Sequence, residues 1–539
     1  MNARPCVTWL SLGLLLAGLG PPLRAADQPQ WGEAWSRNMV SDEKGLPDRF
    51  DLKTGQNVFR KLKLGSETHA TPVIAGGRIF IGTNNGEPRD PKHQGDRGVL
   101  MCFSEKTGEF LWQLVVPKRE EDVYYDWPQS GICSPVTVEG DRAYVVSNRG
   151  EVICLDVQGM ANGNDGPFLD EGSHMTRIPP GADPNGVELL KPGPMDADII
   201  WIFNLTTGAG IWSHDAAHST IMIQGDYLYL NTGTGVDNTH KKIRLAESPS
   251  LVVLDKKTGR LLARENEHIA PRIFHNTWAG PTLGEGKGGA LVFFAAGNGV
   301  VYAFSPLGSE GTDRDGHGLT RTDAEGHAPT AQAVFYSPGV LQLRKVWQFD
   351  FDPTAPKEEV HRYNSNRRES PSDFFGMPVF HGGRLYVAGG GDIWWGKNEA
   401  WLKCINPDGK GDITESGLVW IYPLQKHVMA TPAVSDGLVY IGDVGRTFHC
   451  VDATTGKACW TEEVEGEVWA SALVADGKVF IATRTGAFYV FAAGREKKLL
   501  SKMDLGGPIS ATPVAANGIL YVTTMTHVFA LKGDATAGK

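Results

Sequence analysis

The chain repeats a pattern of two short apolar strands joined by a small-residue turn. Four clear copies are HATPVIAGGRIFIGT from His69, VMATPAVSDGLVYIGD from Val428, VWASALVADGKVFIAT from Val468 and ISATPVAANGILYVTT from Ile509. Each copy has a small-residue start, an apolar strand, a Gly or Asp-Gly turn, and a second strand in which apolar positions alternate. The pattern predicts a β-hairpin in every copy.

A second hairpin follows in most copies. It reads VLMCFSEKTGEFLWQL from Val99, SLVVLDKKTGRLLARE from Ser250 and FHCVDATTGKACWTEE from Phe448. The glycine of the Thr-Gly turn suits a position with positive φ, and the Asp or Ser before it can bond the turn amides. Together the two hairpins predict a unit of four antiparallel strands.

Eight such units follow one another along the chain. They begin near His69, Ile132, His218, Trp278, Phe375, Met429, Trp469 and Ser510. Because repeated four-stranded units form the blades of a β-propeller, we predict an all-β, eight-bladed propeller. The last unit ends early at THVFALKG, and we expect NVFRKLKL, residues 57–64, to supply its outer strand and close the ring.

Three insertions interrupt the repeat. Residues 158–197 and 308–342 separate the third and fourth strands of blades 2 and 4, and GGGDIWWGKNEAW separates the second and third strands of blade 5. We expect these two kinds of loop to emerge on opposite faces of the ring.

The N-terminus has the features of a secretion signal. Arg4 is followed by the mainly apolar run from Val7 to Gly20, and small residues at Ala25 and Ala26 suit cleavage. The run is short for a membrane span, and no later segment is apolar enough for one. We therefore expect a periplasmic or secreted protein. The expected divisions are a signal peptide (1–26), an N-terminal extension (27–56), the propeller (57–533) and a tail (534–539).

Composition agrees with a soluble protein made of strands and turns. The 539 residues include 66 glycines, and 41% are apolar. The net charge of −10 comes with no basic block, which argues against a nucleic-acid partner. Six cysteines follow the signal, and Cys102, Cys154, Cys404 and Cys450 occupy one equivalent strand position. We interpret these four as small buried residues between sheets, and leave a bridge from Cys450 to Cys459 open.

The blade motif resembles the repeat of the PQQ-like (pyrroloquinoline-quinone-like) β-propeller family. It is CVDATTGKACW from Cys450 and, with changes, CFSEKTGEFLW from Cys102. The family includes quinoprotein alcohol and sugar dehydrogenases and also the outer-membrane assembly factor, which binds no quinone. The resemblance implies that the motif tryptophan packs between neighbouring blades. The string DIIWIFNL…HDAAHS…GDYLYLNTGTGVDN looks most like exported bacterial propellers of this type.

Several features expected of a quinoprotein alcohol dehydrogenase are missing. The chain has no adjacent cysteine pair, no loop set that matches the expected calcium ligands, and no Cys-x-x-Cys-His haem site. A PQQ-dependent sugar dehydrogenase need not have the cysteine pair, so PQQ and calcium stay in consideration as cofactors.

Candidate ligand-binding residues lie where the blades meet the axis. The first residues of the units form one ring, in which Trp278, Trp469, Phe375 and Met429 can stack a flat or sugar-like ligand and His69 and His218 add polar contacts, unless they merely plug the channel. Facing loops add Arg149, Arg446 and Arg484, and also Asp392, Trp394 and Trp395. Arginines over an aromatic floor would suit a carboxylated ligand, although loop arginines also commonly bond local carbonyls.

Two segments have the residue types of metal sites. HDAAH, His214 to His218, could bind zinc or copper together with His240 and His275, but as a loop we expect it to make local hydrogen bonds. DVQGMANGNDGPFLDE, Asp156 to Glu171, could bind calcium through its oxygens or be held by Asx turns alone. The identity of any metal stays open.

Two functions are therefore considered. The first is an exported binding or assembly module that recognises a small molecule, a glycan or a protein on one face. The alternative is an oxidoreductase that uses PQQ and calcium to oxidise an alcohol or a sugar. The missing cysteine pair and calcium ligands favour the first, and we assign no catalytic residue.

Overall fold

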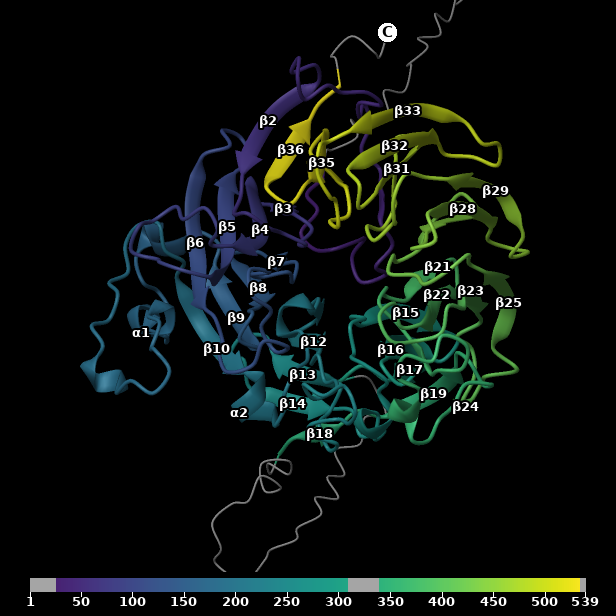
Figure 1. The fold of residues 1–539 in the computed structure, drawn as a ribbon, viewed down its shortest axis with the longest axis horizontal. Coiled ribbons are helices and arrows are strands. Elements are labelled where there is room, and N and C mark those ends of the chain that lie inside the picture. The colour runs from purple at the N-terminus through teal and green to yellow at the C-terminus, as the bar shows by residue number, and fades with distance from the viewer. Residues whose placement is uncertain (1–25, 309–338, 534–539) are drawn as a thin grey trace, which may run out of the picture.

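The computed structural model describes residues 26–308 and 339–533, which form a ring of eight sheets, each built on four antiparallel strands (Figure 1). The prediction of an all-β, eight-bladed propeller is confirmed. The expected signal peptide, except Ala26, lies outside the described residues, as do residues 309–338 of the second insertion and the tail. Within the described part the two α-helices, α1 (Glu171–Met175) and α2 (Leu205–Ala209), have five residues each, and no helix is long and apolar enough to cross a membrane.

The first four blades follow the predicted order. Blade 1 contains β3 (Val73–Ala75), β4 (Arg78–Asn84), β5 (Arg97–Ser104) and β6 (Phe110–Pro117). Blade 2 contains β7 (Thr137–Glu139), β8 (Arg142–Val146), β9 (Glu151–Asp156) and β10 (Ile199–Asn204). Blade 3 contains β11 (Met222–Gln224), β12 (Tyr227–Asn231), β13 (Leu251–Asp255) and β14 (Leu261–Arg264). Blade 4 contains β15 (Thr282–Gly286), β16 (Gly289–Ala296), β17 (Val300–Phe304) and β19 (Lys345–Asp350).

The remaining blades complete the ring. Blade 5 contains β21 (Val379–His381), β22 (Arg384–Gly391), β23 (Ala400–Ile405) and β25 (Leu418–Pro423), and β20 (Ser372–Asp373) also pairs with β22. Blade 6 contains β26 (Ala433–Ser435), β27 (Leu438–Gly442), β28 (Thr447–Asp452) and β29 (Ala458–Glu463). Blade 7 contains β30 (Leu473–Ala475), β31 (Lys478–Ala482), β32 (Ala487–Ala492) and β33 (Leu499–Asp504). Blade 8 contains β34 (Val514–Ala516), β35 (Ile519–Thr523) and β36 (His527–Leu531).

The fourth strand of blade 8 comes from the N-terminal part of the chain. β2 (Val58–Lys63) pairs antiparallel with β36, so the first and last parts of the propeller share one sheet. Three two-residue strands extend other blades by parallel pairing: β1 (Val40–Ser41) on β30, β18 (Leu341–Gln342) on β14 and β24 (Gly411–Asp412) on β19.

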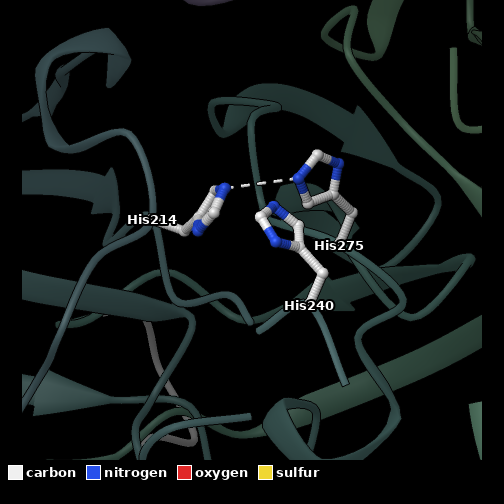
Figure 2. Close-up of side chains that lie close together, drawn as sticks. All are labelled: His214, His240 and His275. Carbon is white, nitrogen blue, oxygen red and sulfur yellow. Dashed lines mark hydrogen bonds between the residues drawn. The ribbon is translucent and has the colours of Figure 1, made fainter. Parts of the chain in front are cut away.

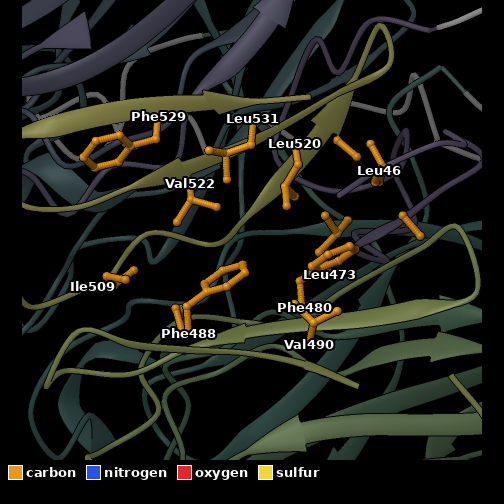
Figure 3. Close-up of a cluster of buried hydrophobic side chains, with 14 of the residues drawn as sticks. Leu46, Leu473, Phe480, Phe488, Val490, Ile509, Leu520, Val522, Phe529 and Leu531 are labelled. Atoms are coloured by element: carbon orange, nitrogen blue, oxygen red, sulfur yellow. The ribbon is translucent and has the colours of Figure 1, made fainter. Parts of the chain in front are cut away.

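Apolar side chains fill the spaces between neighbouring blades. Figure 3 shows one such cluster, in which Phe480 and Phe488 of blade 7 face Leu520 and Val522 of blade 8. Leu46 of the N-terminal extension joins this cluster and is 3% exposed. The alternation that predicted the strands therefore places the apolar residues between sheets.

Outer-strand tryptophans bond to the next blade, as the family resemblance implied. Each indole Nε1 donates to a backbone carbonyl of the following blade: Trp112 to Val157 at 3.0 Å, Trp347 to Pro407 at 2.8 Å, Trp420 to Ala453 at 3.0 Å and Trp460 to Gly494 at 3.0 Å. Since these rings are at most 8% exposed, each contributes both apolar burial and a hydrogen bond to the joint between two blades.

The four equivalent cysteines lie opposite tryptophans on the neighbouring strand. The pairs are Cys102 with Trp112, Cys154 with Trp201, Cys404 with Trp420 and Cys450 with Trp460. All four thiols are buried and free, and burial raises the pKa of Cys154, Cys404 and Cys450 to about 12. The interpretation as small buried residues is confirmed, and Cys450 and Cys459 are not bridged.

The N-terminal extension crosses the innermost strands of several blades. Gln28 pairs with Ile74 of blade 1, Trp35 accepts from Leu283 of blade 4, and Asn38 bonds the backbone of Val434 in blade 6. Arg37 is fully buried beside this path, and its Nε donates to the carbonyl of Pro281. The extension therefore ties distant blades together.

Candidate functional site

A cavity of about 510 Å³ opens among the loops that precede the innermost strands. Six of the eleven predicted ligand-binding residues line it: His69, His218, Trp278, Trp394, Trp395 and Trp469. They come from the loops before β3, β11, β15 and β30 and from the loop between β22 and β23. The site is thus assembled from separate blades around the axis.

Two other predicted residues do not line the cavity but contact residues that do. Phe375 stacks on Trp278, with ring centroids 4.3 Å apart and an angle of 16° between the planes. Asp392 is fully buried and bonds His275, which lines the cavity.

One of the three predicted arginines lies over an aromatic ring of the cavity, and the other two pair with local glutamates. Arg484 lies over the Trp469 ring at 4.6 Å and donates to Ser510 at 2.6 Å, while burial lowers its pKa. Arg149 pairs with Glu151 and Arg446 with Glu463, each at 3.3 Å. None of the three arginines is among the lining residues of the cavity.

One wall of the cavity was missed by sequence reasoning. It comes from the loop between β6 and β7, which contributes Tyr124, Tyr125, Asp126, Trp127, Ser130, Gly131 and Cys133. The aromatic run DVYYDWPQSG lies between two blades and belongs to no strand. Such a run of aromatic residues outside the strands was the sequence feature that could have indicated this wall. Trp127 is 43% exposed at the cavity, and its Nε1 donates to Asp215.

The acidic groups in the cavity have partners. Asp126 accepts from Lys118 and, at 2.7 Å, from Asn148, yet burial raises its pKa. Burial also raises the pKa of Asp215. Among the residues that line the cavity there is no lysine or arginine.

Three histidines that line the cavity lie with their rings together. His214, His240 and His275 each offer one ring nitrogen within 4.8 Å of the others (Figure 2). Nε2 of His275 lies 3.3 Å from Nε2 of His214, and the ring centroids of each pair are 5.0 to 5.3 Å apart. Burial, and then the neighbouring His275 and His240, hold the pKa of His214 well below its usual value.

Aromatic and carboxylate groups hold these imidazoles in place. Tyr124 stacks on His214 with centroids 5.6 Å apart, and Trp395 lies 5.0 Å from His240. Nδ1 of His275 lies 2.8 Å from Oδ2 of Asp392. Three of the four histidines considered for a metal site in the sequence, His214, His240 and His275, lie together. The fourth, His218, lines the cavity apart from them, with Nε2 3.3 Å from the carbonyl of Thr277.

The acidic insertion of blade 2 is largely held by its own contacts. Asp156 and Asp165 lie near Asp198, which precedes β10, but Asp156 also pairs with Arg142 at 2.9 Å. Asn164 donates to Glu171 at 2.8 Å. These contacts are the local turns and side-chain bonds that were considered as an alternative to calcium.

Comparison with known proteins gives matches to part of the chain. Residues 398–497 match the family model described as outer membrane protein assembly factor BamB. A curated relative, 1-butanol dehydrogenase (cytochrome c) of Thauera butanivorans, is 30% identical over 154 residues, which is 25% of this chain and 22% of the relative. The matched segment thus spans about a fifth of the length of that relative.

Several solved structures resemble the fold. BamB from Moraxella catarrhalis has a TM-score of 0.47 and 10% identity, over 89% of this chain and 99% of the other. A europium-containing methanol dehydrogenase has a TM-score of 0.44 and 11% identity, over 94% and 91%. The quinohemoprotein alcohol dehydrogenase from Comamonas testosteroni has a TM-score of 0.44 and 14% identity, over 95% and 82%.

The repeat and its blade joints agree with the match to the family model. The matched residues run from the loop before β23 to the loop after β32, and they include CVDATTGKACW with its Trp460 bond to blade 7. The eight four-stranded blades carry the same hairpins through the rest of the described chain. In its repeated blades and over residues 398–497, the chain is similar to PQQ-like β-propellers.

Proposed function

We propose that the protein is an exported ligand-binding propeller whose axial cavity takes a neutral, ring-shaped small molecule, with neutral mono- and disaccharides as the ligand class. The aromatic wall of the cavity carries the proposal. Trp278, Trp394, Trp395, Trp469 and Trp127 all line one space of about 510 Å³. Binding cavities for small molecules commonly measure about 300–1,000 Å³ and combine aromatic walls with a few polar groups.

The exposure of two tryptophans supports this use. Trp127 and Trp394 are each 43% exposed, although tryptophan is a highly buried residue on average. A partly exposed indole face can stack against a sugar ring. Ser130, His69 and Asp215 supply hydrogen-bonding groups around these rings.

The charges of the cavity favour a neutral ligand over a carboxylated one. An acidic ligand would need a cation to offset its desolvation, and the lining residues include no lysine or arginine. Arg149 and Arg446 instead pair with Glu151 and Glu463. The proposal therefore narrows the ligand class expected from the sequence.

The cavity does not fit the alternative, a calcium-bound quinone. Calcium takes about six to eight oxygen ligands. Here the converging ligand atoms are imidazole nitrogens, and Asp126 is already bonded to Lys118 and Asn148. The carboxylates of PQQ would also meet no lining cation. We therefore derive no oxidation step through this cofactor.

We include export in the proposal because residues 1–26 have the features of a secretion signal. A protein partner, suggested by the BamB family model, could bind outside the cavity, but the match covers scaffold strands of blades 5 to 7. The cavity is the more specific feature, so the small-molecule ligand is the one proposed.

Calorimetry on the full chain, freed of metal by chelator, tests the proposal. Glucose, galactose, maltose and cellobiose are titrated beside glucuronic acid and PQQ with calcium. We expect saturable heat from at least one neutral sugar, weakened roughly tenfold or more by Trp394→Ala. Phe59→Ala removes an equally exposed ring, 46%, from β2 and should leave binding unchanged. Heat only from the acidic compounds, no heat at all, or equal binding by Trp394→Ala would overturn the proposal.

A further inference from the structure

We propose that His214, His240 and His275 form a binding site for a first-row transition-metal ion, zinc or copper, in the wall of the axial cavity. The site goes beyond the proposed ligand-binding function and does not depend on it. It rests on how the three rings converge, on the carboxylate that orients one of them, and on their access to the cavity.

The three histidines come from separate loops. His214 precedes β11, His240 lies between β12 and β13, and His275 lies between β14 and β15. Their convergence is therefore a product of the tertiary fold, with two neighbouring blades contributing. Burying three imidazoles together is costly unless their polar atoms are used, and all three are buried.

The spacing of the nitrogens suits a metal ion. All three ligand nitrogens lie within 4.8 Å of one another. In a tetrahedral zinc site with Zn–N bonds of about 2.0–2.1 Å, two nitrogens lie about 3.3 Å apart. The Nε2 atoms of His214 and His275 are separated by 3.3 Å. The third nitrogen, on His240, lies within 4.8 Å of both.

Asp392 acts as a positioning residue for His275. Its Oδ2 lies 2.8 Å from Nδ1 of His275, which places the ring proton on Nδ1 and leaves the lone pair of Nε2 directed at His214. Its Oδ1 accepts from the backbone N–H groups of Trp394 and Trp395, at 2.9 and 2.7 Å. A carboxylate that holds a histidine in this way is the usual outer partner of a metal ligand.

The same contacts argue against a purely local hydrogen-bond network. Such a network links His214 to His275, because one of their two Nε2 atoms can donate to the other. The His240 ring bonds the backbone of Asn238, but no hydrogen bond links it to His214 or His275, although it lies beside both rings. A shared metal ion uses all three lone pairs at once.

The ligand set selects the class of metal. Imidazole nitrogen suits zinc, copper, iron and nickel, whereas calcium and magnesium prefer oxygen. Because all three histidines line the cavity, a metal held by them keeps a free coordination position for water or for an oxygen of a bound ligand. The aromatic side chains of Tyr124 and Trp278 flank the rings and limit solvent around such an ion.

Metal titration of the full chain, without any sugar, tests the site. After removal of metal by a chelator, we expect one equivalent of Co²⁺ to give the intense visible bands of a four-coordinate nitrogen site, and one equivalent of Zn²⁺ to abolish them. Each of His214→Ala, His240→Ala and His275→Ala should weaken binding roughly 100-fold or more, since even outer-partner changes cost about 10–100-fold. His268→Asn is the matched control, because this exposed histidine lies outside the cavity and asparagine tolerates its φ of 48°.

A second measurement keeps the proposal testable if a variant fails to fold. Crystals of the unmutated protein soaked in Zn²⁺ should give an anomalous difference peak among the three rings. Binding that survives in folded histidine variants, a peak elsewhere only, or no peak and no cobalt bands would overturn the proposal. Failure to bind sugar would contradict only the proposed function, because the metal measurements contain none.

Discussion

Nδ1 of His275 and Oδ2 of Asp392 lie 2.8 Å apart, with both side chains buried beside the axial cavity. This pair makes Asp392→Asn an informative change. Asparagine keeps Oδ1, which accepts from the N–H groups of Trp394 and Trp395, but places an NH₂ donor opposite Nδ1. His275 would then accept at Nδ1 and carry its proton on Nε2, the nitrogen needed by a metal.

We therefore expect Asp392→Asn to weaken Zn²⁺ binding about 10–100-fold, while the Tm of the metal-free protein changes little. Competition with a chromophoric chelator measures the affinity, and thermal unfolding measures the stability. Equal Zn²⁺ affinity in the variant and the unmutated protein would show that Asp392 does not orient the ring for a metal.

The blades could be predicted from sequence because each hairpin is local. The alternation of apolar residues and the Gly turns lie within single hairpins, so no long-range contact is needed to recognise them. The same strand pattern predicted a small buried residue at Cys450, which lies opposite Trp460. The contact between the motif tryptophan and the next blade could be predicted only from the family resemblance.

The candidate site was predicted in part, because its residues come from loops of different lengths. Trp278 and Phe375 were placed at the axis by their positions before the first strands, and their rings stack there. His240 and His275 lie in irregular loops, where no periodicity sets the direction of a side chain. Arg446 has the same position in its short loop as the other predicted arginines. Its guanidinium nevertheless forms an ion pair with a nearby glutamate, Glu463.

The N-terminal extension should contribute to stability through Asn38. Its Nδ2 donates to the carbonyl of Val434 at 2.7 Å, and its Oδ1 accepts from the N–H of Val434 at 2.8 Å. Asn38→Ala leaves both of these backbone groups buried without a partner, so we expect a loss of about 2–4 kcal/mol and a lower Tm. Glu33→Ala, an exposed change in the same extension, is the control. Equal effects of the two substitutions in thermal unfolding would contradict this role.

Gly456 should be sensitive to substitution because of a tryptophan from the preceding blade. A Cβ at this glycine would lie 2.6 Å from the ring of Trp420, and φ is 69°. Left-handed strain and overpacking together predict a loss of about 2–4 kcal/mol for Gly456→Ala. Gly437→Ala is a matched control, with φ 73° and no atom within 4 Å of the added Cβ, so it carries the strain alone. Urea unfolding of both variants measures the difference, and equal losses would show that the contact with Trp420 is not restrictive.

Glu151 should make stability depend on pH in the acid range. Burial acts to raise its pKa, but the hydrogen bond and charge of His174, with the charge of Arg149, outweigh it and lower the pKa to about 2. Because the folded pKa lies below the ordinary value of about 4.5, the contribution is complete above that pH and is lost as the pH falls toward 2. We expect Glu151→Gln to cost about 3 kcal/mol at pH 7 and progressively less from pH 4.5 to pH 3. Thermal unfolding at pH 7, 5, 4 and 3 measures this convergence, with Glu285→Gln as an exposed control. A gap in Tm that stays constant with pH would mean that the ion pair between α1 and blade 2 does not set this dependence.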